Sequence, residues 1–146
     1  MIYNIALSLV EGIGHKTAKL LLNKFESAEA IFKSSVKDLS SIEGVGQMRS
    51  KAFKDKQVLK QAEEILVQHD KQGIDILFYK NPSFPKRLVQ CEDAPIILYY
   101  KGVAPLNAQK MLAIIGTRKN TEYGAKMTEY MMEQFQVIND LVIVSG

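Results

Sequence analysis

The sequence predicts a fold of the α plus α/β class, in which a small all-helical domain precedes the first half of a parallel-sheet α/β domain. Three observations support this. Residues 1–72 contain no proline and place apolar side chains at helical spacing. Four short apolar, β-branched runs follow Gly73, and an amphipathic segment separates the last two, as in a strand–helix–strand unit. We expect the two domains to cover residues 1–72 and 73–146.

The helical domain is predicted from two apolar stripes and a terminator. The stripes recur every three or four residues: Leu20, Leu21 and Phe25; Val58, Ala62, Ile65 and Leu66. Gly73 follows the second stripe at a position where glycine commonly supplies the left-handed residue that ends a helix.

A weak internal repeat divides this domain in two. "LVEGIGHKTAKLLL" (9–22) and "SIEGVGQMRSKAF" (41–53) share an apolar-Glu-Gly-apolar-Gly core, and the repeat resembles a tandem helix-hairpin-helix. Glycine permits a tight turn, and the amides that follow it can face a phosphate without reading a base. The alternative is that the turns are only compact corners between helices. The phosphate contacts predicted here are Gly12, Gly14, Lys16, Gly44, Gly46 and Arg49.

The second domain is predicted from strands at residues 74–79, 95–100, 111–116 and 141–146, which read like buried strands of a parallel sheet. The helix between the last two is expected to begin near Asn120 or Thr121, both good N-cap residues. Its apolar positions fall on one helical face: Tyr123, Met127, Tyr130, Met131 and Phe135.

The turn "GTRKNT" (116–121) is the strongest candidate site. It lies at the carboxyl edge of a predicted parallel strand, where open α/β folds bind ligands. Its amides and the start of the next helix form an anion nest, to which Arg118 adds a forked donor and Lys119 a second charge. Thr117 or Thr121 can add a hydroxyl. The spacing is neither GxGxxG nor GxxxxGK[ST], so ordinary dinucleotide binding and Walker-type hydrolysis are poorly supported.

Composition sets the limits of this interpretation. The net charge is +3, from 19 basic and 16 acidic residues, so nucleic-acid binding has to come from placed groups rather than bulk charge. No apolar run approaches a membrane span. The single cysteine, Cys91, excludes an internal disulfide, and with His15 and His69 it makes no metal site. No cofactor is expected.

Residues 84–124 carry a specific resemblance. "FPKRLVQCEDAPIILYYKG" (84–102), "LAIIGTRKNTEYG" (112–124) and "IVSG" (143–146) are similar to the DNA-processing protein A (DprA, or Smf) family. The tandem hairpins also fit bacterial members, although Phe84 stands where the family often has tyrosine. The resemblance implies a Rossmann-like second domain and a cytoplasmic, non-catalytic protein of natural transformation and competence. Such a protein binds and protects incoming single-stranded DNA and helps to load a RecA-type recombinase during recombination.

Carried over position by position, the resemblance makes Arg118 the leading phosphate ligand, with Gly116 and Thr117 as backbone contacts and Lys101 as a further cation. The family's Rossmann-like domain continues past Ser-Gly with another phosphate loop and a self-association surface. We therefore expect residues 73–146 to be a truncated domain and a homodimer to form only in the full-length protein.

Two other functions fit the sequence. One is a nucleotide-binding or nucleotide-cleaving α/β enzyme that uses the phosphate loop at residues 116–121, with Glu122 and Glu129 as its nearest carboxylates. The other is an interaction module whose hairpins and turn contact only protein.

Overall fold

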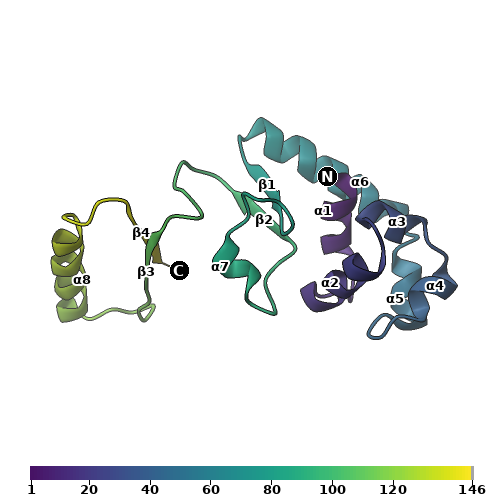
Figure 1. Ribbon diagram of the computed structural model, residues 1–146, viewed down its shortest axis with the longest axis horizontal. Helices are drawn as coiled ribbons and strands as arrows, with labels where there is room; N and C mark the ends of the chain where they lie inside the picture. The colour runs from purple at the N-terminus through teal and green to yellow at the C-terminus, as the bar shows by residue number, and fades with distance from the viewer. Residues whose placement is uncertain (146) are drawn as a thin grey trace. The chain divides into compact units, whose positions relative to one another are not determined.

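A computed structural model describes residues 1–145, which divide into two compact units, Met1–Gly102 and Val103–Gly146 (Figure 1). The first unit contains α1 (Ile2–Leu9), α2 (His15–Lys24), α3 (Ala28–Lys33), α4 (Val36–Ser40), α5 (Gly46–Ala52), α6 (Lys56–Lys71), β1 (Asp75–Phe78), α7 (Lys86–Val89) and β2 (Ile97–Tyr100). The second contains β3 (Lys110–Ile114), α8 (Glu122–Phe135) and β4 (Leu141–Ser145). The sequence-based boundary at residues 72 and 73 stays a prediction, because compactness groups β1, α7 and β2 with the helices.

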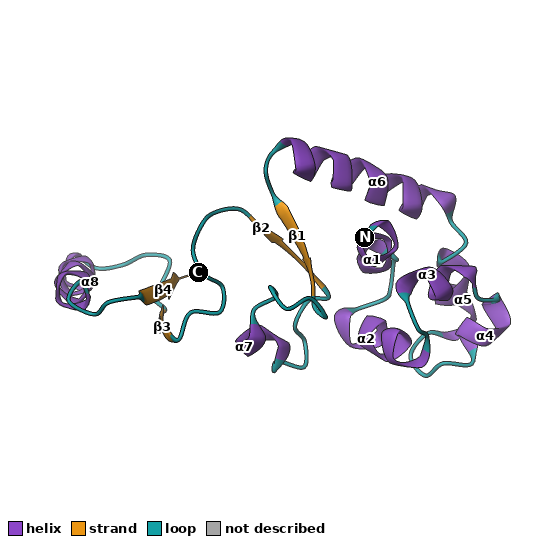
Figure 2. Cartoon of the chain, turned by 45° about the horizontal axis from the view of Figure 1, so that its top comes forward, coloured by secondary structure: helices purple, strands orange, loops and turns teal. Residues whose placement is uncertain are grey.

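The core of the first unit lies among the helices and reaches the first strands. Helix α1 packs against both α3 and the long α6, and α6 also contacts β1 (Figure 2). The deepest apolar side chains include Ile5, Leu7, Leu21, Ile31, Leu39 and Ile96. No helix among the described residues is both long and apolar enough to span a lipid bilayer.

Most of the predicted helical stripes face this core. Val58 and Ala62 are buried, and Ile65 and Leu66 pack against the cluster at its margin. Leu20 is the exception: it is 51% exposed, because α2 turns Leu21 and the neighbouring Leu22 inward instead. Leu20 is therefore a position of the apolar stripe that does not face the core.

The end of α6 follows the predicted glycine rule. Gly73 adopts φ +63°, a left-handed conformation that costs a residue without Cβ little. Its amide donates to the carbonyl of Asp70 over 3.2 Å, and the amide of Ile74 donates to the carbonyl of His69 over 2.9 Å. This pair of bonds is a Schellman motif, which satisfies the last carbonyls of the helix and turns the chain into β1.

The first two strands pair differently from the prediction. β1 and β2 form an antiparallel two-stranded sheet in which Asp75 lies opposite Tyr100 and Phe78 opposite Ile97. A parallel pair needs a crossover long enough to return to the same end of the sheet, usually a full helix. The connection at residues 79–96 is instead built from turns, three prolines and the four-residue α7, so the chain reverses direction. The parallel arrangement expected for these two runs was wrong.

The second unit is a single parallel β–α–β unit, as predicted. β3 pairs with β4 in parallel register from Lys110 opposite Leu141 to Ile114 opposite Ser145, with α8 between them in the chain. The predicted strand at 141–146 is described to Ser145, and its last residue lies outside the described part of the chain. With helices in one unit and a parallel β–α–β in the other, the α plus α/β class is confirmed.

The apolar side chains of α8 fall into two groups that differ in solvent exposure. Met131 and Phe135 are partly buried, whereas Tyr123 and Tyr130 are 72% and 56% exposed, and Met127 is also exposed. The five positions predicted to share one face therefore do not share one environment.

Candidate functional site

The turn after β3 leaves its backbone donors open. Residues 116–121 connect β3 to α8, and all six are exposed. Among the described residues, no carbonyl or side chain accepts a hydrogen bond from the amides of residues 117–120. The first amides of α8 likewise lack intrahelical acceptors, as in any helix. The turn therefore presents several backbone N–H groups to solvent, which is the arrangement that binds an oxyanion.

The two threonine hydroxyls of this turn have different roles. Thr121 is the N-cap of α8, as the sequence predicted: its Oγ1 accepts from the amide of Gly124 over 3.1 Å. Because a hydroxyl can accept and donate at once, the proton of Thr121 remains free for a ligand. Thr117 instead donates its proton to the carbonyl of Lys119 over 2.8 Å, which stabilises the turn but leaves no hydroxyl donor for an anion.

The charges at the turn are positive and accessible. Arg118 and Lys119 are both exposed, and within residues 1–145 no acidic side chain pairs with either of them. The acid that follows, Glu122, is held by Lys126 at 2.8 Å in an i,i+4 pair on α8. The guanidinium of Arg118 can therefore bind an incoming phosphate without first breaking an internal ion pair.

Neither the backbone conformation nor the packing at position 116 requires a glycine. Its φ lies outside the left-handed region, and no described atom lies within 4 Å of the position that a Cβ would take. Neither backbone strain nor packing explains a glycine here. A glycine here leaves the space in front of the amides open, whereas a side chain would fill part of it.

Lys101 belongs to the other compact unit. It is exposed immediately after β2 and precedes Gly102, whose φ is +145°. Five of the six predicted strand-edge residues therefore lie in one turn, and the sixth, Lys101, lies in the first compact unit.

The two hairpins pack against each other reciprocally. A Cβ at Gly12 would lie 3.1 Å from Nε of Arg49, and a Cβ at Gly44 would lie 3.6 Å from Oγ1 of Thr17. Thr17 and Arg49 each stand five residues after the first glycine of their own hairpin. The repeat therefore forms a pseudo-twofold pair, in which the first glycine of each turn contacts the helix that follows the other turn.

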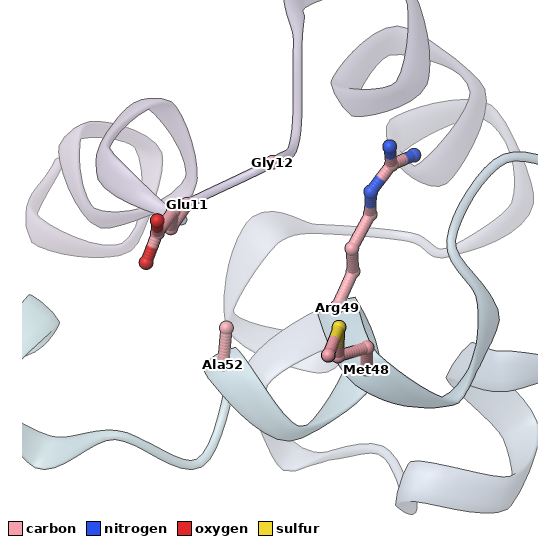
Figure 3. Close-up of a pocket in the computed structure, with 5 residues that line it drawn as sticks. All are labelled: Glu11, Gly12, Met48, Arg49 and Ala52. Atoms are coloured by element: carbon pink, nitrogen blue, oxygen red, sulfur yellow. The ribbon is translucent and has the colours of Figure 1, made fainter.

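Arg49 connects the two turns. Figure 3 shows its side chain rising from α5 toward the segment that carries Gly12, and its Nη1 donates to the carbonyl of Gly44. A cavity of about 440 Å³ opens beside this contact, lined by Glu11, Gly12, Met48, Arg49 and Ala52 (Figure 3). Arg49 thus has an internal structural role in addition to any contact with a ligand.

The remaining hairpin residues differ in how open they are. Ile13 and Val45, the apolar residues between the paired glycines, are buried. Gly14 and Gly46 have no atom within 4 Å of a Cβ position, so their backbone faces free space. A side chain at the second glycine of each turn would therefore meet open space, whereas one at the first glycine would contact the helix that follows the other turn.

The lysines that follow the first hairpin are engaged. Nζ of Lys16 lies 2.7 Å from Oε2 of Glu92, and Nζ of Lys19 donates to the carbonyls of Cys91 at 3.4 Å and Glu92 at 3.2 Å. We refer to these contacts as the α2 clasp. The hydrogen bond and charge of Lys16 lower the pKa of the Glu92 carboxyl, and Glu92 raises the pKa of Lys16 in return.

Two further lysines of the first unit also donate to carbonyls. Lys54 donates to Phe32 and Ser34 at the end of α3, and Lys80 donates to Leu22 in the last turn of α2. Cations at helix C-termini complement the dipole there. Sequence reasoning missed Glu92 because it lies 76 residues from Lys16, and no local signal connects the two. Within residues 1–145, no three His, Cys, Asp or Glu side chains gather into a metal site.

Comparison with known proteins gives two family matches. Residues 75–146 match the family model described as DNA recombination-mediator protein A, and residues 5–51 match the SAM-like helix-hairpin-helix tandem. The chain is 30% identical to Protein Smf of Synechocystis over 149 aligned positions, which cover 99% of this chain and 37% of the relative. It is 38% identical to the DNA processing protein DprA of Streptococcus pneumoniae over 76 positions, which cover 47% of this chain and 26% of the relative.

A third relative is a DNA ligase of Fervidobacterium nodosum, which is 34% identical over 67 positions covering 46% of this chain and 10% of the ligase. No solved structure is significantly similar to the chain. The chain thus spans well under half the length of each of these curated relatives.

Proposed function

Because the chain belongs to the DNA recombination-mediator protein A (DprA/Smf) family, we propose that the protein binds single-stranded DNA and holds a backbone phosphate in the turn at residues 116–121. The match to the DNA recombination-mediator family model and the similarity to a relative named as a DNA processing protein support this proposal. The observation that carries it is the open turn itself, where one exposed loop combines a capped helix start with amides and a guanidinium that have no partner among residues 1–145.

Each part of the turn has a distinct role in this proposal. The amides of residues 117–120 and the Thr121 hydroxyl donate to phosphate oxygens, while Arg118 donates two parallel N–H groups. Lys119 supplies a second, looser charge. None of these groups reads a base edge, so the binding is expected to be largely independent of sequence.

A second set of contacts is proposed on the first unit. Gly14 and Gly46 expose backbone toward open space, and Lys101 is an accessible cation. In this proposal Gly12, Gly44 and Arg49 act mainly by fixing the two turns against each other. The hairpins then add affinity to a strand whose primary contact is the turn.

We further propose a non-catalytic, cytoplasmic role in natural transformation, in which the bound strand is protected and passed to a RecA-type recombinase. A homodimer is proposed only for the full-length protein. A nucleotide-cleaving enzyme is less well supported, because Glu122, the carboxylate nearest the turn, is paired with Lys126 rather than directed at a ligand.

The direct test is a salt titration of binding by the full-length protein. Affinity for an oligothymidine should exceed affinity for a duplex of the same length. Its logarithm should fall with the logarithm of salt concentration at a slope steeper than about −1.4, since each neutralised phosphate of a single strand contributes about −0.7. Equal affinity for the two DNA forms, or a slope near zero, would argue against the proposal.

The glycine of the turn gives a separate prediction. Gly116→Ala should leave the free energy of unfolding unchanged or raise it by up to about 1 kcal/mol, because the backbone there is unstrained and the space is open. The same change should weaken single-strand binding roughly two- to tenfold by obstructing one amide contact. Thermal unfolding and fluorescence anisotropy measure the two effects. A loss of stability, or an unaltered affinity, would contradict the prediction.

A further inference from the structure

The α2 clasp engages two lysines, of which Lys16 is exposed to solvent. The side chains of Lys16 and Glu92 are 65% and 85% exposed, so their ion pair forms in water. Exposed pairs of this kind are weak and exchange readily with solvent ions. The contact therefore does little to hold the fold together, and an anion from solution can replace the carboxylate.

The surface around the clasp is shaped to accept a strand. A cavity of about 420 Å³ lies between α2 and the segment after α7, lined among others by Lys16, Lys19, Leu20, Asn23, Val89 and Gln90. Leu20 and Val89 are both exposed apolar side chains. The cavity thus offers apolar surface for a sugar or base edge, amides that can hydrogen-bond, and ammonium groups at the border.

The local charge depends on Glu92. Lys16 and Lys19 carry two positive charges, while Glu92 and the adjacent Asp93 carry two negative charges, so the net local charge is zero. If the carboxylate of Glu92 is removed, the same group carries a net charge of +1. Since phosphate and carboxylate oxygens meet an ammonium in the same way, one can substitute for the other.

We propose that Glu92 determines affinity for nucleic acid by occupying Lys16 in the free protein, in competition with a DNA phosphate that binds in the cavity between α2 and residues 89–92. This inference rests on the proposed function. It adds a phosphate contact at Lys16, directly after the first hairpin. This contact forms only when the carboxylate of Glu92 no longer pairs with Lys16. Lys19 donates to backbone carbonyls rather than to the carboxylate, so the exchange at Lys16 does not require the contacts of Lys19 to break.

Glu92→Gln tests the competition directly. In the full-length protein we expect it to raise affinity for an oligothymidine by about two- to fivefold at low salt, the effect of releasing one exposed ion pair. The salt slope should become steeper by about 0.7, because one more phosphate is neutralised. The double variant Glu92→Gln/Lys16→Gln should lose both gains.

Glu29→Gln is the matched control. Glu29 pairs with Lys33 at 2.6 Å on the exposed side of α3, so this change removes the same charge from a similar pair away from the cavity. We expect Glu29→Gln to leave affinity and salt slope unaltered. Equal gains from Glu29→Gln and Glu92→Gln would reveal a general charge effect and overturn the inference.

Arg118→Ala separates this inference from the proposed function. If Glu92→Gln binds like the wild type while Arg118→Ala binds less well, Glu92 is not a competitor, and the turn at 116–121 stands. If neither the wild type nor Glu92→Gln binds single-stranded DNA, both proposals fail.

Discussion

Replacing Arg118 with alanine in the full-length protein is expected to weaken binding of single-stranded DNA by about tenfold or more, because hydrogen bonds to charged groups contribute roughly 1.5–3 kcal/mol. The guanidinium is exposed, and no acidic side chain among the described residues pairs with it. It can therefore give its full hydrogen-bonding capacity to a phosphate. The salt slope of binding should become shallower by about 0.7 for each phosphate that is no longer neutralised. Fluorescence anisotropy across a salt series measures both quantities.

Two further variants interpret that result. Arg118→Lys keeps the charge but loses the fork of parallel donors, so the salt slope should persist while affinity falls. Lys60→Ala removes an exposed charge from α6, where Lys60 lies near Glu64, and should change neither quantity. If Arg118→Ala behaves like Lys60→Ala, the turn is not the phosphate site.

Features that depend on neighbouring residues could be predicted from the sequence. Thr121 caps α8 because a short hydroxyl side chain can reach an amide three residues later, and this chemistry is visible in the sequence. Gly73 ends α6 for an equally local reason. The β3–α8–β4 unit followed from the spacing of two apolar runs around an amphipathic segment. In each case the interaction that decides the structure spans only a few residues or one supersecondary unit.

The direction of the first two strands could not be predicted in the same way. The runs that form β1 and β2 are as apolar as those that form β3 and β4, yet one pair is antiparallel and the other parallel. Burial selects apolar residues in both arrangements, so composition does not report strand direction. The connection decides it: residues 79–96 form turns and a four-residue helix, whereas α8 has 14 residues.

The interaction partners of individual charged side chains also could not be predicted from the sequence. Lys16 and Arg49 read as free cations beside glycine turns, but Glu92 pairs with the first and the carbonyl of Gly44 accepts from the second. The first of these partners comes from far along the chain, so only the tertiary fold brings it near. Arg118 differs from these two residues. It lies in an exposed loop and has no acidic partner among the described residues.

The reciprocal packing of the hairpins leads to the second large effect. Gly12→Ala is expected to destabilise the first unit by roughly 2 kcal/mol or more. A left-handed backbone costs a residue with a Cβ about 1–2 kcal/mol, and Gly12 has φ +76°. The new methyl group would also lie 3.1 Å from Nε of Arg49, so that side chain would have to move. Hydrogen exchange of the core amides of α1 and α6 in the full-length protein reports the loss of stability.

The other hairpin glycines separate the two causes. Gly44→Ala has the same left-handed strain at φ +81°, but its Cβ would meet Thr17 only at an ordinary 3.6 Å, so it should cost less than Gly12→Ala. Gly14→Ala has neither feature and should cost less than about 1 kcal/mol, the usual effect of losing a glycine N-cap. In an Arg49→Ala background the cost of Gly12→Ala should fall toward that of Gly44→Ala, because the clash is gone while the strain remains. Equal costs at Gly12 and Gly44, with no change in the Arg49→Ala background, would mean that the contact with Arg49 adds nothing to the cost at Gly12.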